Sequence, residues 1–73
     1  MKAVIQAMQA HPDHEGVNEY GCDALYYIAR ENGALQQAVK AAGGNTVAQA
    51  AITNHPNMTA VVKSAKNLIS LLK

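Results

Sequence analysis

The strongest constraint on this chain is an internal repeat. Residues 6–17 (QAMQAHPDHEGV) align with residues 50–61 (AAITNHPNMTAV), so the His-Pro pair at His11 recurs 44 residues later at His55. Downstream, four apolar or small positions match at helical steps of four, four and three. These pairs are Val17 with Val61, Gly21 with Ala65, Leu25 with Ile69, and Ile28 with Leu72. The repeat predicts two similar helical units that bury their apolar faces by stacking on each other.

The repeated His-Pro pair is interpreted as a corner between two helices. Proline fixes its own φ angle and moves the preceding residue out of helical geometry, so one helix ends there. The next residues, Asp13 and Asn57, belong to types that cap a following helix. His11, Asp13 and His14 have metal-ligand chemistry, but the pattern offers no fourth ligand or second shell, and a solvated corner is favoured over a metal site.

The remaining breaks complete an all-α prediction. Asn32-Gly33 and Gly43-Gly44 are expected to end helices, because glycine adopts the left-handed conformation found there. Asn45 or Thr46 is expected to cap the helix that follows the second break. No stretch shows the alternation of a strand. Helices are predicted at residues 1–10, 14–31, 34–42, 45–54 and 58–72.

Composition limits the possible functions. The chain has 73 residues, one cysteine and a formal net charge of +1. A single small domain buries little core, no disulfide forms within the chain, and the balanced charge does not favour nucleic acid. No apolar run approaches the roughly 20 residues of a membrane span, and no secretory signal pattern is present. We expect a cytoplasmic protein without membrane or nucleic-acid partners and without a cofactor.

Residues 21–52 (GCDALYYIARENGALQQAVKAAGGNTVAQAAI) carry a family resemblance. This stretch resembles the junction of two armadillo repeats, in which a long third helix is followed by a short first helix that ends in Ala-Gly-Gly and then by a second helix. The 44-residue period falls within the range of about 40–47 for such helical repeats. The resemblance implies a single armadillo-like α-solenoid module over 1–73, with fewer than two full repeats. Residues 1–31 would supply the second and third helices of one repeat, and 33–73 one full repeat.

Such a module is expected to complete its core from outside. Solenoids usually need at least about three repeats for stability, so this chain is either a piece of a longer array or a small unit that stacks on a partner or on copies of itself. Its charges bear on self-stacking: all five acids precede residue 32, and four of the six cations follow it. Glu19 and Lys63 are repeat-equivalent and are predicted to pair within or between copies, although solvated faces are an equally weighted interpretation. The predicted self-association surface comprises Val4, Ile5, Met8, Glu19, Lys63, Leu68, Ile69 and Leu72.

The family resemblance also implies a concave groove lined by third helices. The Asn and Trp positions with which peptide-binding armadillo proteins hold a peptide are occupied here by Tyr27 and Asp23, and by Leu71 and Asn67 in the second copy. That departure argues against their mode of peptide recognition. Tyrosines still suit an interface, because they combine apolar area with a hydroxyl group, although packing inside the protein is an alternative role. The residues predicted to line a partner-binding groove are Tyr20, Asp23, Tyr27, Glu31, Ser64 and Asn67.

Catalysis is not expected. Cys22 lies beside Gly21 on the apolar side of its helix, where cysteine usually behaves as a small buried hydrophobe. The glycines lack phosphate-binding spacing, and Glu19 and Asp23 belong to an exposed stripe. The sequence therefore predicts a non-catalytic protein–protein interaction or scaffolding module. The alternative is a structural homo-oligomer assembled by head-to-tail stacking.

Overall fold

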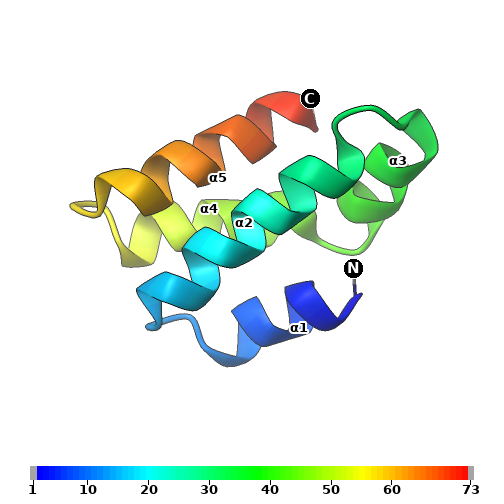
Figure 1. Ribbon diagram of the computed structural model, residues 1–73. Coiled ribbons are helices and arrows are strands. Elements are labelled where there is room, and N and C mark those ends of the chain that lie inside the picture. The colour runs from blue at the N-terminus through cyan, green and yellow to red at the C-terminus, as the bar shows by residue number, and fades with distance from the viewer. Residues whose placement is uncertain (1, 73) are drawn as a thin grey trace.

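The computed structural model describes residues 2–72, which form five α-helices joined by short connections (Figure 1). The helices are α1 (Lys2–Ala10), α2 (Glu15–Ala29), α3 (Gly33–Ala41), α4 (Gly44–Asn54) and α5 (Thr59–Leu71). The prediction of an all-α chain of about five helices is confirmed. The expected start of the first helix at Met1 and the expected end of the repeat at Lys73 lie outside the described residues.

The two His-Pro corners have the same backbone hydrogen bonds. In the first corner the N–H of His14 donates to the carbonyl of His11 over 3.1 Å, and α2 begins one residue later. In the second corner the N–H of Met58 donates to the carbonyl of His55 over 3.1 Å, and α5 begins one residue later. Each proline therefore produces the same tight turn, and the two turns lie 44 residues apart in the chain.

The residues predicted to cap the helices after these corners do not do so. The N-cap of α2 is His14, with extended backbone angles, and its Nδ1 accepts a hydrogen bond from the N–H of Val17 at 3.1 Å. The N-cap of α5 is Met58, which offers no side-chain hydrogen bond. Asp13 and Asn57 are placed within the turns instead, because the proline turn extends one residue further than the sequence suggested.

The two glycine-containing breaks differ from each other. Asn32 caps α3 with its Oδ1, which accepts from the N–H of Leu35 at 3.0 Å. Among the described residues only Gly43 has a positive φ, 101°, and it stands as the N-cap of α4. Since α4 begins directly after Gly43, neither Asn45 nor Thr46 caps it, and the buried Oδ1 of Asn45 has no hydrogen-bond partner.

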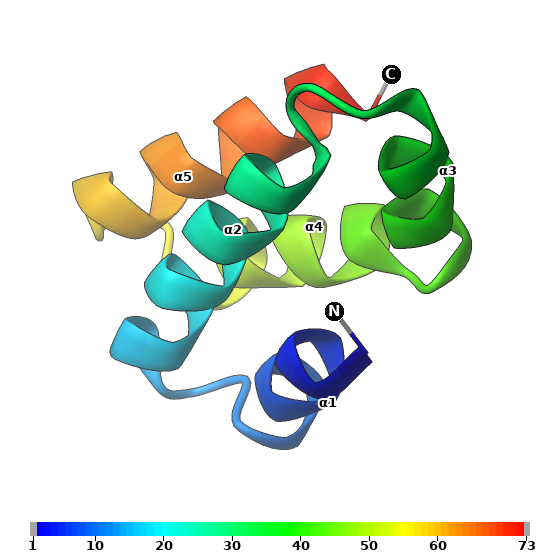
Figure 2. The same cartoon turned by 45° about the vertical axis from the view of Figure 1, so that its right-hand side comes forward.

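The helix pair α4–α5 lies beside the pair α1–α2 in the same orientation (Figures 1 and 2). In both views α1 and α4 run in one direction, and α2 and α5 run in the other. The central helix is α2, which packs against α1, α3, α4 and α5, while α3 links the far end of α2 to α4. The second pair is thus related to the first by a side-by-side displacement.

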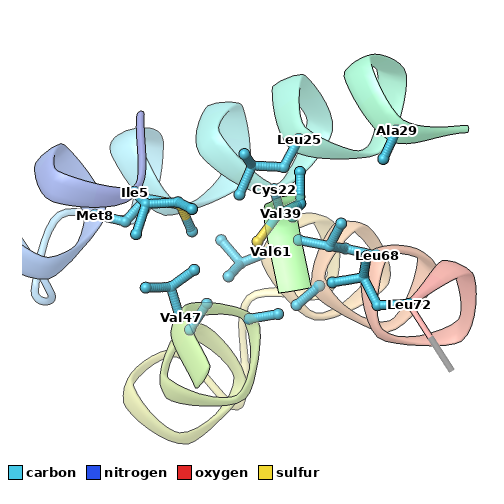
Figure 3. Close-up of a cluster of buried hydrophobic side chains, with 13 residues drawn as sticks. Ile5, Met8, Cys22, Leu25, Ala29, Val39, Val47, Val61, Leu68 and Leu72 are labelled. Atoms are coloured by element: carbon cyan, nitrogen blue, oxygen red, sulfur yellow. The ribbon is translucent and has the colours of Figure 1, made fainter. Parts of the chain in front are cut away.

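The core fills the space between these two pairs (Figure 3). Its side chains come from all five helices, and the largest fully buried ones belong to α2, α3 and α5. Cys22 is fully buried among them, which confirms the expectation that it acts as a small hydrophobe. The buried apolar residues are Ile5, Met8, Cys22, Leu25, Ala29, Val39, Val47, Ala48, Ala51, Val61, Ala65, Leu68 and Leu72.

Candidate functional site

A groove of about 520 Å³ runs between α1 and the first half of α2. Apart from one histidine and one tyrosine, its lining consists of aliphatic side chains and glycines. We call it the α1–α2 groove. It is lined by Ala3, Val4, Ala7, His14, Gly16, Val17, Tyr20 and Gly21.

Small residues give the α1–α2 groove its shape. At Gly21 a Cβ atom would overlap the side chain of Met8, so α1 packs closely on α2 only because this position is glycine. At Gly16 a Cβ would lie 3.1 Å from the imidazole of His14. Ala7 is exposed and too short to reach across to α2. The result is an apolar hollow that no side chain of the described residues fills.

Comparison of the two copies shows what is unusual about this groove. Moving each α1 and α2 lining residue forward by 44 positions gives Val47, Ala48, Ala51, Ala60, Val61, Ser64 and Ala65. All of these except Ala60 are buried in the second copy, where α4 and α5 pack against the first copy. In the first copy, by contrast, only Gly21 is buried. The α1–α2 groove is therefore the uncovered counterpart of a face that the second copy buries.

The opposite end of the molecule carries a second open face, on α5. A shallow hollow of about 440 Å³ is lined by Pro56, Thr59, Val62, Lys63, Lys66 and Asn67, which we call the α5 face. On α2 the counterparts of Val62 and Lys66 are Asn18 and Cys22, and both are buried. The α5 face thus corresponds to the side of the first copy that receives the second, with a lysine where the first copy has a cysteine.

Hydrogen bonds hold the corner beside the groove in place. The Nδ2 of the buried Asn18 donates to the carbonyl oxygens of His14 at 2.8 Å, His11 at 3.2 Å and Pro12 at 3.3 Å. The Nε2 of His55 lies 2.9 Å from the same Pro12 carbonyl oxygen. The two His-Pro corners are therefore joined, and His14, which lines the groove, is fixed at the start of α2.

Five of the six residues predicted to line a third-helix groove are exposed, and Ser64 is buried. Tyr20 and Tyr27 are 76% and 66% exposed, which places both on the surface. Tyr27 is accompanied by Tyr26, whose ring stands edge-on to it at 5.9 Å, and by the Arg30 guanidinium at 5.6 Å from its centroid. Asp23, Glu31 and Asn67 are also exposed.

Ser64 is the exception in that predicted groove. It is only 8% exposed, because its part of α5 packs towards α2. Its repeat-equivalent, Tyr20, lies on the corresponding face of the first copy, which nothing covers. The prediction that Ser64 lines an open groove is therefore wrong for this conformation of the chain.

The predicted self-association surface needs a similar correction. Ile5, Met8, Leu68 and Leu72 lie in the core of the chain itself, since five helices already enclose them. Val4 and Ile69 are half-buried. Glu19 and Lys63 form no ion pair within the chain; over residues 2–72 the structure records one such pair, between Arg30 and Glu31 at 3.9 Å.

Two findings concern the reactive side chains of the described residues. Burial raises the pKa of the Cys22 thiol to about 12, with a smaller contribution from the nearby negative charge of Asp23. A thiol in that state is a poor nucleophile, because the thiolate is the reactive form. Within residues 2–72, no three His, Cys, Asp or Glu side chains gather closely enough to hold a metal ion.

Sequence reasoning missed most of the α1–α2 groove. It selected Val4 and Tyr20 but not Ala3, Ala7 or Gly16, because small residues give little signal in a helical pattern. The repeat contains the pattern that could have predicted the groove. When each residue is compared with its counterpart 44 positions away, one face of the helix pair is largely apolar in both copies.

None of the described helices is both long enough and apolar enough to cross a bilayer. No family model, curated protein or solved structure matches the chain.

Proposed function

We propose that this chain is a non-catalytic protein–protein interaction module of the armadillo-like type, and that the α1–α2 groove is its binding surface. The observation that carries the proposal is the comparison of the two copies. The groove residues are exposed or half-buried with the exception of Gly21, whereas six of their seven repeat-equivalents on α4 and α5 are buried against neighbouring helices.

Further features support this use of the groove. Its lining is apolar along both α1 and α2, and exposed apolar hollows of this kind mark interaction sites. Tyr20, 76% exposed, stands at the groove and supplies the large amphipathic side chain that interface centres favour. Side-by-side helix pairs and the repeated corner are features that armadillo-like solenoids share.

The occupant that such a surface favours is a helical face. Val47, Ala48 and Val61, the counterparts of groove residues, lie where α4 and α5 pack on other helices and not on extended chain. A groove between two helices accepts the apolar side of a third helix through residues spaced three and four apart. We therefore expect the binding partner to present a helix with a small apolar face.

The proposal is tested with a displayed library of amphipathic helical peptides. Selection uses the wild-type chain at low concentration, with counter-selection against Ala7→Arg, in which a long charged side chain fills the groove. The matched control is Ala34→Arg on the exposed start of α3, remote in sequence from the groove. Enriched peptides should bind wild type and Ala34→Arg equally and Ala7→Arg at least about tenfold more weakly.

Amide chemical-shift changes on peptide addition locate the binding site. They should be confined to α1, the first corner and the first half of α2. If no peptide is enriched, or if the shift changes fall on other helices and Ala7→Arg binds normally, the groove is not the binding surface and the proposal fails.

A further inference from the structure

We infer that the α1–α2 groove receives the α5 face of a second copy of this chain, in a head-to-tail contact that repeats the junction between the two halves of the molecule. This inference rests on the proposed function, because it uses the same groove, and it adds the identity of the partner.

The internal junction supplies the geometric argument. Inside the chain, α5 packs alongside α2 in the same direction (Figure 1). Val61, Ser64 and Ala65 are buried on α5, and Cys22 and Leu25 are buried on α2. Figure 3 shows Val61, Cys22 and Leu25 within the core. One further displacement of the same kind places α5 of one copy beside α2 of the next. The two faces that this step brings together are the α5 face and the α1–α2 groove, which are the open ends of the repeat.

Charge favours a head-to-tail contact between two copies over a tail-to-tail one. Within its bounds α2 carries Glu15, Glu19 and Asp23 and no cation, whereas α5 carries Lys63 and Lys66 and no acid. Of these five residues, none takes part in the ion pair recorded for the described chain. The three acids lie outside the groove lining, on the side of α2 whose repeat-equivalents form the α5 face. In a head-to-tail contact the lysines of α5 meet a groove lined by no lysine or arginine, while a tail-to-tail contact opposes lysine with lysine.

Two side chains at the new contact are much larger than their counterparts in the internal junction. Tyr20 stands where the second copy has Ser64, and Lys66 stands where the first copy has Cys22. Both are larger than their counterparts, and Lys66 adds a charge, so the contact is looser and more electrostatic than the internal one. An ammonium group near a tyrosine ring is itself attractive, which gives these two residues a favourable way to meet. We therefore expect weak, salt-sensitive association that gives a ring or an open chain of copies.

The first test is the solution mass of the wild-type chain by light scattering. The mass should rise above 7.7 kDa, the mass of one chain, as its concentration increases from about 10 µM to about 1 mM. It should fall back towards one chain when salt rises from about 50 to about 500 mM, since exposed charges are then screened.

A charge exchange tests the direction of the contact. Ala7→Arg places a cation opposite the lysines, and Lys66→Glu replaces the ammonium group that meets the Tyr20 ring with a carboxylate, so each variant alone should associate more weakly than wild type. Mixed in equal amounts they should regain association, because the guanidinium introduced into the groove of one variant then meets the carboxylate introduced on the α5 face of the other. The unmodified groove and the unmodified α5 face of the mixture can also meet.

The controls for the charge exchange lie on α3. Ala34→Arg and Lys40→Glu change charge away from both faces and should associate like wild type. All four substitutions lie at exposed positions, and circular dichroism verifies that each variant folds.

The possible outcomes separate the two proposals. A wild-type chain that stays monomeric up to about 1 mM, or a mixture that fails to regain association, overturns the second copy as partner. If helical peptides still bind the groove in that case, the proposed function stands with a foreign partner. If the chain associates but Ala7→Arg associates equally well, the groove plays no part in self-association and the second copy is overturned as its occupant, while the peptide selection decides the proposed function separately.

Discussion

The imidazole of His55 and the carbonyl oxygen of Pro12 lie 2.9 Å apart and join the two corners of the repeat. A carbonyl oxygen only accepts, so the proton in this hydrogen bond is on Nε2 of His55. The contact spans 43 residues of sequence and ties the start of α5 to the start of α2. The two helix pairs are thus connected at one end by a hydrogen bond and along their length by the apolar core.

Loss of the His55 imidazole should loosen the two corners. His55→Ala is expected to lower the free energy of unfolding by about 0.5–1.5 kcal/mol, the net value of one intramolecular hydrogen bond. The control is His11→Ala at the repeat-equivalent position, where the side chain is exposed and makes no recorded hydrogen bond. Urea unfolding followed by circular dichroism measures both. Equal destabilisation by the two variants would contradict a specific role for the His55 contact.

The cap at the start of α2 depends on one imidazole nitrogen. His14→Ala removes the Nδ1 acceptor for the N–H of Val17 and should cost about 1 kcal/mol of stability. His14→Asp should restore or exceed wild-type stability, because aspartate is a stronger cap and its charge suits the helix N-terminus. Thermal unfolding of the three proteins gives the ranking. An Asp variant no more stable than the Ala variant would show that the hydrogen bond is not what His14 contributes.

Gly44 should tolerate no side chain. A Cβ there would contact the Val39 side chain and lie 2.9 Å from the Val39 carbonyl oxygen, which is backbone and moves little. Gly44→Ala is therefore expected to destabilise by about 1–3 kcal/mol, as overpacking does. Gly33→Ala is the matched control, since nothing lies within 4 Å of its Cβ position, and it should be neutral or stabilising by up to about 1 kcal/mol. Comparable losses in both variants would point to a general effect of replacing glycine.

Cys22 gives a pH dependence whose sign follows from its burial. Its pKa rises from 9.0 to about 12 on folding, so the folded state holds the thiol proton that the unfolded state has lost at high pH. This contribution to stability is fully present below pH 9 and is lost as pH rises from 9 towards 12. Unfolding measured across that range should show a weaker loss of stability in Cys22→Ala than in wild type. Identical slopes would indicate that the thiol ionises equally in both states.

The same burial predicts low thiol reactivity. At about pH 8 a thiol reagent such as iodoacetamide should modify Cys22 only at the rate at which the chain opens. Addition of urea to the unfolding midpoint should therefore increase the rate of modification by several orders of magnitude. Fast modification of the native protein, measured by mass spectrometry, would contradict the buried position.

The helices and corners were predictable because proline and glycine act locally. Pro12, Pro56 and Gly43 each break a helix through their own backbone geometry, whatever surrounds them. The caps were less predictable, because which residue becomes extended depends on how far each turn runs. The sequence favours Asp13 over the neighbouring His14 as a cap, because histidine is not among the residue types preferred at that position.

The site was harder to predict from the sequence than the fold, because the exposure of a side chain depends on which helices pack beside it. Ile5 and Leu72 carry the same helical pattern whether they face a partner or the core of their own chain, and the sequence pattern alone does not distinguish the two. Ser64 and Tyr20 occupy equivalent positions, yet one is covered and the other is open. Only the arrangement of the two helix pairs decides this, since α2 packs on the Ser64 side of α5, whereas none of the described helices packs over the Tyr20 side of α2.

The parallel placement of the two helix pairs determines whether further helix pairs can be added to such a protein. If the two helix pairs were related by a two-fold rotation, each would bury the same surface against the other. Because they are related by a shift, the first pair keeps an open entry side, the α1–α2 groove, and the second keeps an open exit side, the α5 face. This stays true however many units are added. The inner packing therefore sets no upper limit on the number of units. At the exit side Lys66 stands where the inner junction has Cys22, so each added unit would dock on a charged side chain and not on a small apolar one.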